Sequence, residues 1–234
     1  MKIDYCLIGS TTNPLYLDFW PVVSKIWKEV FNITPVLGLI CDEDSDLISD
    51  EYGIIKKIKA SKLTDEGTQS QIIRMYLSKF LSGNCIISDI DMIPLSKQYF
   101  IDNLIEYSDD DVLVMSSHHY QTINIKQYPM CYVVGNSKNF NNIFETESNW
   151  DEFVIKSSRN GWYSDQCFLY ESIQKYGVEN VKFPYRSFSN DRVDRDQWYY
   201  DANAVKEGKY IDSHLLRPHI SYKTQNELLI NLLY

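Results

Sequence analysis

Apolar segments of strand length alternate with segments of helical periodicity in the first part of the chain. The predicted strands are Tyr5–Gly9, Thr34–Cys41, Tyr52–Ile58 and Cys85–Ser88, and the predicted helices are Leu15–Val30 and Thr68–Leu81. Strand-helix-strand units of this length connect parallel strands through right-handed crossovers. We therefore expect an α/β fold with a mixed, mostly parallel central sheet flanked by helices.

The second half of the chain is less regular. It predicts strands at Val112–Met115 and Met130–Val134 and a helix near Asp165–Tyr176, and then becomes rich in Tyr, Arg and Asp up to Asp201. No linker-like, repeated or low-complexity segment divides the sequence. A single domain over residues 1–234 is expected.

The strand Cys85–Ser88 ends on two carboxylates, Asp89 and Asp91. The strand is apolar and β-branched, as expected for burial on both faces, and Pro94 stops further ladder hydrogen bonding. Residues i and i+2 of an extended segment point the same way, so the two carboxylates can face one point. They would repel each other unless a cation lies between them, and Mg²⁺ or Mn²⁺ suits such oxygen ligands. The alternative is an ordinary polar turn, where Asp is common.

The charge of the chain limits its partners. The formal net charge is −9 and there is no block of Lys and Arg, which argues against nucleic-acid binding through a basic face. An acidic protein that binds a phosphate ligand needs a local cation. A metal ion at Asp89 and Asp91 would supply one.

The cysteines and the apolar runs indicate the compartment. The five cysteines are widely spaced without a Cys-x-x-Cys motif, and most lie in apolar runs, where a free Cys behaves as a small core residue in a reducing compartment. The amino terminus lacks the apolar region of a signal peptide, and no apolar run approaches the roughly 20 residues that span a bilayer. A soluble cytoplasmic protein is expected.

The turn after the first strand lacks the glycine patterns of common nucleotide-binding loops. Gly9-Ser10-Thr11-Thr12-Asn13 is neither Gly-x-Gly-x-x-Gly nor a P-loop, which argues against a dinucleotide dehydrogenase or an NTPase. A nucleotidyltransferase would also need a Gly-rich loop to hold triphosphate oxygens. Ligands bind outside the carboxyl ends of such strands, so the loops after Gly9, Cys41 and Ser88 are expected to meet at one edge of the sheet.

The strand-helix-strand half followed by Ser88-Asp89-Ile90-Asp91 resembles the GT-A class of nucleotide-sugar-dependent glycosyltransferases, of a compact single-domain type with an Asp-x-Asp motif. Gly161-Trp162-Tyr163-Ser164-Asp165-Gln166 lies where such enzymes often place an acidic residue facing the donor sugar and acceptor. Tyr210 to His219 resembles the segment in which many members supply a His as a further metal ligand. The resemblance implies a Rossmann-like GT-A fold, with a nucleotide-binding half at about 1–95 and an acceptor-binding, metal-completing half at about 96–234.

The resemblance also implies a reaction in glycan biosynthesis. A sugar would pass from a nucleoside-diphosphate sugar, with UDP as the default nucleotide and GDP as the alternative, to a hydroxyl of a glycan or other acceptor. Asp89, Asp91 and His214 would hold Mn²⁺ or Mg²⁺. Asp165 would be the catalytic base of an inverting reaction, which we favour, or would orient the sugar in a retaining one. The candidates for binding the nucleotide-sugar are Ser10, Thr11, Asp42, Gln71, Arg74, Asp89, Trp162 and Gln166.

Each candidate also has a plainer interpretation. Asp165 could serve only as a helix cap, and His214 could be a structural hydrogen-bonding residue. Ordinary surface positions are the alternative for Arg74, Asp42, His118 and His119, of which the two histidines could otherwise line the acceptor site. Two other functions remain open on this fold, a nucleotidyltransferase and a non-catalytic domain that binds nucleotide-sugars or glycans.

Overall fold

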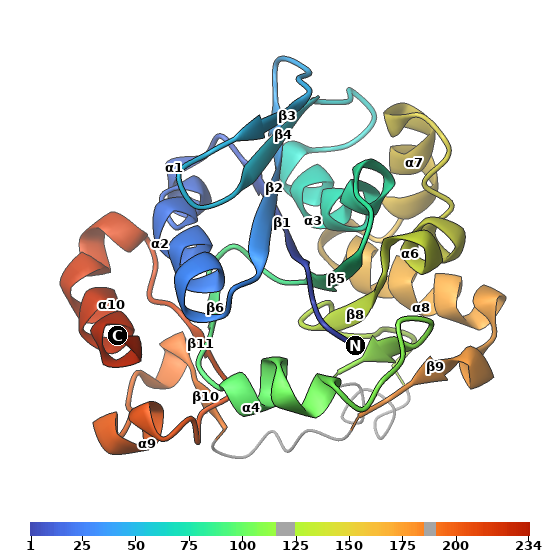
Figure 1. The fold of residues 1–234 in the computed structure, drawn as a ribbon. Helices are drawn as coiled ribbons and strands as arrows, with labels where there is room; N and C mark the ends of the chain where they lie inside the picture. The colour runs from blue at the N-terminus through green and yellow to red at the C-terminus, as the bar shows by residue number, and fades with distance from the viewer. Residues whose placement is uncertain (116–124, 185–190) are drawn as a thin grey trace.

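The computed structural model describes residues 1–115, 125–184 and 191–234. Within these ranges an eight-stranded sheet has the order β3-β4-β2-β1-β5-β8-β7-β9 (Figure 1). Its strands are β1 (Tyr5–Thr11), β2 (Thr34–Cys41), β3 (Leu47–Ser49), β4 (Ile54–Lys59), β5 (Asn84–Ile87), β7 (Val112–Val114), β8 (Val133–Asn136) and β9 (Val181–Lys182). Strands β4, β2, β1 and β5 are mutually parallel, whereas β3 and β8 run antiparallel to their neighbours. The expected mixed, mostly parallel sheet is confirmed.

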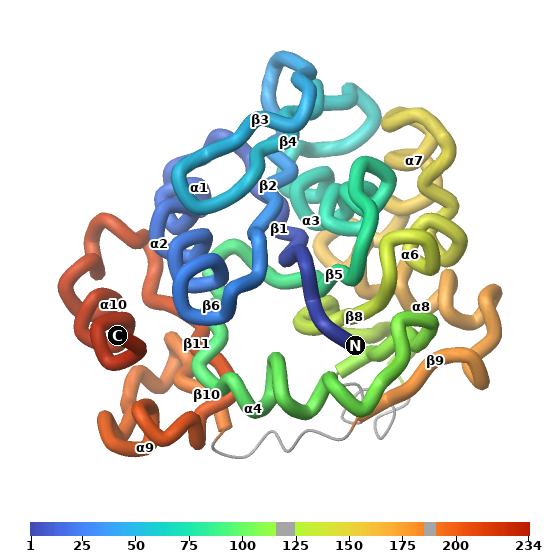
Figure 2. The backbone as a smooth tube through the Cα atoms, viewed as in Figure 1, coloured from blue at the N-terminus to red at the C-terminus, as the bar shows by residue number. Residues whose placement is uncertain are grey.

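Helices cover both faces of this sheet (Figures 1 and 2). They are α1 (Pro14–Leu17), α2 (Trp20–Lys25), α3 (Glu66–Tyr76), α4 (Lys97–Phe100), α6 (Ser137–Phe144), α7 (Trp150–Ser157), α8 (Ser164–Tyr176), α9 (Ala202–Lys206) and α10 (Lys223–Ile230). Successive residues of β1 enter different cores. Cys6 and Ile8 belong to the core that includes α2, α4 and α10, whereas Leu7 belongs to the core that includes α3, α6, α7 and α8. The central strands are therefore buried on both faces, as their continuous apolar sequences indicate.

The predicted helices differ from the observed ones at their boundaries. The predicted helix over Leu15–Val30 is divided into α1, α2 and a π-helical turn at Ile26–Val30. Pro21 lies in the first turn of α2, where its fixed φ and missing N–H are tolerated. Helix α3 begins earlier than predicted because Asp65 caps it, with Oδ1 accepting from the N–H of Thr68 at 2.8 Å. None of the helices that the structure describes has the length and apolar composition needed to cross a bilayer.

Two strand predictions in the sheet are also corrected. Strand β3 was not predicted. The side chains of its three residues are all exposed, so they show no burial pattern. It pairs antiparallel with β4. Strand β8 occupies Val133–Asn136, later in the chain than the predicted Met130–Val134, although its first residues are apolar and buried as expected.

A second sheet joins two distant parts of the chain. Its strands are β6 (Met92–Pro94), β10 (Arg192–Val193) and β11 (Asp212–His214), in the order β10-β11-β6. Strand β6 directly follows Asp91, and antiparallel pairing places His214 of β11 opposite Met92. The N–H of Leu215 donates to the carbonyl oxygen of Asp91 at 2.9 Å. This pairing holds the carboxyl-terminal segment beside the Asp-x-Asp motif.

The close approach of β1 and α3 depends on Gly9. A Cβ atom at Gly9 would lie 2.0 Å from the carbonyl oxygen of Ser70 and 2.8 Å from Cγ2 of Ile73, so no larger residue fits without a shift of the backbone. Because Gly9 lies near the carboxyl end of β1, this contact brings α3 to the edge of the sheet where β5 also ends. The side chain of Arg74, one turn beyond Ser70, is thereby placed at that edge.

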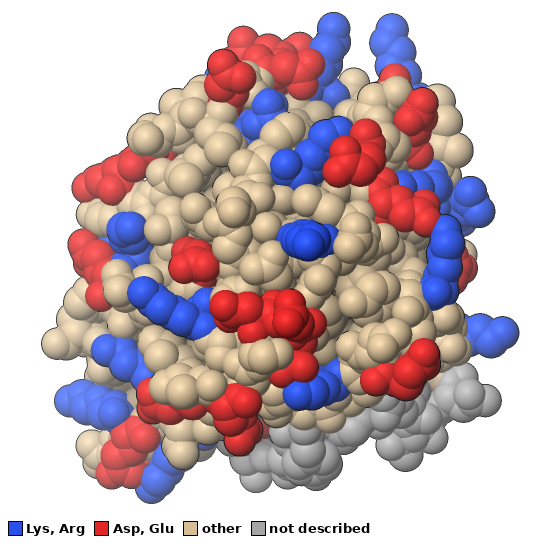
Figure 3. Space-filling model, turned by 45° about the vertical axis from the view of Figure 1, so that its right-hand side comes forward, with Lys and Arg blue, Asp and Glu red and all other residues tan. Residues whose placement is uncertain are grey.

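Charged side chains of both signs are dispersed on the face shown in Figure 3. Lysine and arginine lie singly or in small groups between aspartate and glutamate on that face. This pattern agrees with the absence of a Lys/Arg block in the sequence.

Candidate active site

A cavity of about 650 Å³ opens where β1 and β5 end. Its size lies within the range of about 300–1,000 Å³ that small-molecule sites have. Its wall includes the loop after β1, helix α3, the Asp-x-Asp motif, the start of α8 and the carboxyl-terminal segment. The predicted site residues that line it are Ser10, Thr11, Gln71, Arg74, Asp89, Asp91, Trp162, Asp165, Gln166 and His214. Residues from five parts of the sequence therefore meet at the edge where ligand-binding loops were expected.

One predicted site residue in the described ranges does not line the cavity. Asp42 is exposed and is not among the residues that line the cavity, so the structure does not bring it to the other candidates. The acidic turn that contains it follows β2, one strand further from β5. His118 and His119 fall outside the described residues.

Arg74 links the Asp-x-Asp motif to helix α8. Its Nη1 forms an ion pair with Asp89, and its Nη2 donates to Oδ2 of Asp165 at 2.5 Å. Its Nε donates to the carbonyl oxygen of Gln71 at 2.9 Å. The side chains of Arg74 and Asp165 are each 5% exposed, whereas that of Asp89 is 43% exposed. We call Arg74, Asp89 and Asp165 the Arg74 cluster.

Burial and charge have opposite effects on the pKa values of the two carboxyl groups in the Arg74 cluster. Burial raises the pKa of Asp165, and the positive charge of Arg74 offsets only part of this effect. Burial would also raise the pKa of Asp89, but the charge of Arg74, with a contribution from Cys131, holds that pKa below its ordinary value. Two carboxylates thus share one guanidinium group.

The capping interpretation of Asp165 accounts for only part of its contacts. Asp165 is the second residue of α8, and its Oδ1 accepts from the N–H of Gln166 at 2.8 Å. Its other oxygen is held by Arg74, a residue 91 positions earlier in the chain. A residue that only capped α8 would have no need of this buried ion pair.

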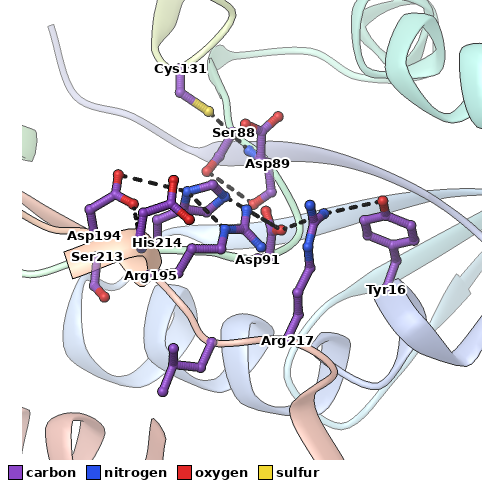
Figure 4. Close-up of polar contacts among 12 residues, drawn as sticks. Tyr16, Ser88, Asp89, Asp91, Cys131, Asp194, Arg195, Ser213, His214 and Arg217 are labelled. Atoms are coloured by element: carbon purple, nitrogen blue, oxygen red, sulfur yellow. Dashed lines mark hydrogen bonds and ion pairs between the residues drawn. The ribbon is translucent and has the colours of Figure 1, made fainter. Parts of the chain in front are cut away.

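Asp91 lies among three cationic or basic side chains (Figure 4). Its Oδ2 accepts from Nη2 of Arg195 at 2.9 Å, and lies 3.6 Å from Nε2 of His214 and 3.7 Å from Nη1 of Arg217. Arg195 also donates from Nε to Nδ1 of His214 at 3.2 Å. The side chain of Asp91 is only 7% exposed. We call Asp91, Arg195, His214 and Arg217 the Asp91 cluster.

The arginines of this region are the residues that the sequence analysis missed as site residues. Arg192, Arg195 and Arg217 all line the cavity. Arg192 is fixed by a bidentate ion pair with the buried Asp212, at 2.6 and 2.8 Å. Their spacing follows no known motif. The available signal was the accumulation of Arg and Asp near residues 192–196 in an otherwise acidic chain.

Two glutamine side chains in the cavity wall have an unused hydrogen-bond acceptor. The Oε1 atoms of Gln71 and Gln166 are buried and accept no hydrogen bond from the residues that the structure describes. A buried acceptor without a donor is unfavourable by about 1–3 kcal/mol. Both residues line the cavity, so a ligand hydroxyl would satisfy either atom once its amide group turned toward the cavity.

The donor atoms of the Asp91 cluster fit a hard divalent ion in their chemistry. A carboxylate oxygen and an imidazole nitrogen suit Mn²⁺, and such ions often take their remaining ligands from water and substrate phosphates. Burial lowers the pKa of His214 although Asp91 opposes this effect, so the neutral imidazole is favoured. No group of three His, Cys, Asp or Glu side chains within the described ranges is gathered closely enough to form a complete cage. The residues thus fit an ion that a phosphate ligand completes.

No protein-family model matches the sequence, and a search of curated proteins finds no match. The fold is similar to solved glycosyltransferases. The galactosyltransferase LgtC, determined with donor and acceptor sugar analogs, aligns with a TM-score of 0.51 and 12% identity over 99% of this chain and 95% of its own. A glycosyltransferase involved in glycosylation of the major capsid of PBCV-1 aligns with a TM-score of 0.53 and 9% identity over 97% of this chain and 100% of its own.

The glycosyltransferase GlyE of Streptococcus pneumoniae TIGR4 aligns with a TM-score of 0.51 and 10% identity. The alignment covers 100% of this chain and 60% of GlyE, so this chain spans little more than half of that protein. At these identities the three likenesses establish the fold. The GT-A fold that the sequence resemblance implied is confirmed.

Proposed function

We propose that the chain is a metal-dependent glycosyltransferase that moves a sugar from a nucleoside-diphosphate sugar, by default a UDP-sugar, to a hydroxyl of a glycan or another acceptor. The observation that carries this proposal is the cavity. It combines the carboxylates of the Asp-x-Asp motif, a group of arginines and two unused amide acceptors in one space. The fold shared with three glycosyltransferases supports the same conclusion.

The lining residues indicate which part of a nucleotide-sugar donor would bind in which part of the cavity. Ser10 and Thr11 are the last two residues of β1, beside the first turns of α3, and would contact the nucleotide. Arg195 and Arg217 would bind the diphosphate, since guanidinium groups match phosphate oxygens in charge and geometry. Gln71 and Gln166 would accept hydrogen bonds from sugar hydroxyls if their amide groups turned toward the cavity that both residues line.

Asp91 and His214, with Asp89 at the same strand end, would hold Mn²⁺ or Mg²⁺. Such an ion supplies positive charge that stabilises the departing diphosphate. Arg217 contributes a fixed positive charge at the same place. Its Nη1 donates to the hydroxyl of Tyr16 at 3.1 Å, which holds the guanidinium group beside α1.

The contacts of Asp165 favour an orienting role. A general base must offer an accessible oxygen to the acceptor hydroxyl. Oδ2 of Asp165 is instead held by Arg74 at 2.5 Å and Oδ1 by the N–H of Gln166 at 2.8 Å. We therefore propose that Asp165 helps to orient the donor sugar by holding Arg74 and the start of α8 in place, as in the retaining alternative, rather than acting as the base of the inverting reaction. Determining the anomeric configuration of the product by NMR tests this point.

Trp162 would contribute to the acceptor side of the cavity. It lines the cavity but is 63% exposed, so its ring forms part of the rim. An aromatic face at a rim can stack against the apolar face of a sugar ring without closing the entrance. Its position just before α8 places it close to Asp165, where the donor sugar is proposed to lie.

A screen of nucleotide-sugars with and without Mn²⁺ tests the proposed function. We expect one of them to raise the melting temperature in the presence of Mn²⁺, because a ligand that binds only the folded state stabilises it. The same nucleotide-sugar should then be hydrolysed slowly to the free sugar. Stabilisation without hydrolysis or transfer would indicate a non-catalytic binding domain. Pyrophosphate release from UTP and a sugar phosphate would indicate a nucleotidyltransferase.

A further inference from the structure

Arg195 makes hydrogen bonds to both residues that we assign as the main metal ligands. Its Nη2 donates to Oδ2 of Asp91 at 2.9 Å and its Nε to Nδ1 of His214 at 3.2 Å. Its side chain is 12% exposed. Figure 4 shows its guanidinium group beside the imidazole and the carboxylate. The structure therefore places the positive charge of a side chain at both of these residues.

The hydrogen bond from Arg195 determines which nitrogen of His214 can bind a metal ion. Because Nδ1 accepts from Arg195, the proton of a neutral imidazole must be on Nε2, the atom that faces Asp91. A metal-binding histidine uses the unprotonated nitrogen and donates its other N–H to a carboxylate or carbonyl. Nε2 therefore becomes a ligand only after Arg195 leaves Nδ1. Oδ2 of Asp194 lies 4.0 Å from Nδ1, so after a small shift it would accept a hydrogen bond from an Nδ1–H group.

Arg195 also has a donor that the described residues do not use. Its Nη1 is buried and donates to none of them. A buried cationic N–H without an acceptor is unfavourable, and a phosphate oxygen is the type of acceptor that a guanidinium group prefers. The diphosphate of a donor would thus offer Arg195 a partner in exchange for Asp91 and His214.

We propose that Arg195 competes with a metal ion for Asp91 and His214, and that it moves to the diphosphate when ion and nucleotide bind together. This inference rests on the proposed function, because it assumes the metal site of a glycosyltransferase. It implies that Mn²⁺ alone binds weakly and that a nucleoside diphosphate strengthens Mn²⁺ binding. Arg195 is a positioning residue for the ion as well as a ligand of the diphosphate.

Mn²⁺ titration of the nucleotide-free protein, followed by electron paramagnetic resonance, tests the proposal. Arg195→Gln should bind Mn²⁺ about tenfold more tightly than the wild type, since it removes a competing charged hydrogen bond. Arg195→Lys should show a smaller gain, because a compact ammonium group cannot bind both Asp91 and His214 in a forked geometry. Addition of UDP should strengthen Mn²⁺ binding more in the wild type than in Arg195→Gln.

Two controls define the outcome. Lys138→Gln removes one exposed positive charge on α6 and should leave Mn²⁺ affinity unchanged. Asp91→Ala in the Arg195→Gln background should abolish the gain, which assigns it to this site. An Arg195→Gln variant that binds Mn²⁺ no more tightly than the wild type overturns this inference alone if the wild type still binds Mn²⁺ with UDP. Absence of Mn²⁺ binding in every variant, with and without UDP, overturns the inference together with the metal dependence of the proposed function.

Discussion

The Arg74 cluster and the Asp91 cluster face the same cavity but have opposite balances of charge. In the Arg74 cluster one guanidinium group is shared by two carboxylates, and Arg74 is buried and bonded through Nε and both terminal nitrogens. In the Asp91 cluster one carboxylate is shared by two guanidinium groups and an imidazole, and Nη1 of Arg195 is left without an acceptor within the described part of the chain. The first arrangement is saturated and holds α3, β5 and α8 together. The second has excess positive charge available for an anionic ligand.

The largest expected effect comes from removing the cation of the saturated cluster. Arg74→Met should lower the free energy of unfolding by about 3–5 kcal/mol, because it leaves the buried Asp165 without its partner. Arg195→Gln should lower it by less, because Arg217 and His214 remain near Asp91. Urea denaturation followed by circular dichroism measures both. Equal losses of stability in the two variants would remove the distinction between the clusters.

Removing the carboxylate of the second cluster should affect binding rather than stability. Asp91→Ala should weaken Mn²⁺-dependent UDP binding about 100-fold, whereas His214→Ala should weaken it about tenfold, since a neutral ligand contributes less charge. Without Mn²⁺, UDP should still bind Asp91→Ala, because Arg195 and Arg217 no longer have a carboxylate partner. Isothermal titration calorimetry measures all three affinities. Unchanged metal-dependent affinity in Asp91→Ala would disprove the metal assignment.

Asp165→Asn tests whether the Arg74 cluster positions the donor or performs the chemistry. We expect donor affinity to fall about tenfold while kcat falls by less, because the amide oxygen can still accept from Arg74 but the charge is lost. A general base would give the opposite result, with donor affinity kept and kcat lowered by about 10²–10⁴. Steady-state kinetics combined with direct measurement of donor affinity separates the two outcomes.

The smallest expected effect concerns the cap that starts the helix of Arg74. The hydrogen bonds from the hydroxyl and N–H of Thr68 lower the pKa of Asp65 in the folded state. Its contribution to stability is therefore present above the unfolded pKa of about 3.9 and is lost as the pH falls toward the lower folded value. Asp65→Ala should cost about 1 kcal/mol at pH 7 and progressively less as the pH falls below the unfolded pKa, as measured by unfolding over a series of pH values. A cost independent of pH would mean that the cap acts without its charge.

The main sheet could be predicted from the sequence because its central strands are long enough to show a pattern. Strand β2 coincides with the prediction, and β1 and β5 differ from theirs only at the ends, since each is a continuous apolar run. Strands β10 and β11 have two and three residues, which is too short for any periodic signal. The second sheet was therefore missed, and with it the reason why His214 lies beside Asp91.

The gathering of the candidate residues at one cavity could be predicted for those residues whose place on a strand or helix fixes their place in the fold. Asp89 and Asp91 end a buried strand, and Arg74 lies on the helix that packs beside it, so their meeting at one edge could be anticipated. The ion pairs that they form could not be anticipated. Arg74 was predicted to contact the nucleotide, and its ion pairs with two carboxylates were not predicted, because they depend on the three-dimensional position of α8. Arg195 was missed because it lies in a short turn that no pattern marks.

The Asp91 cluster joins residues that are far apart in the chain, so it can form only late in the synthesis of the protein. Asp91 and Arg195 are 104 positions apart. At roughly 5–20 residues per second, the ribosome adds the second about 5–20 s after the first. During that interval the nascent chain has β1, β2, β4 and β5 but no partner for β6. A product that stops before residue 195 lacks Arg195, His214 and Arg217, so the Asp91 cluster cannot form in it.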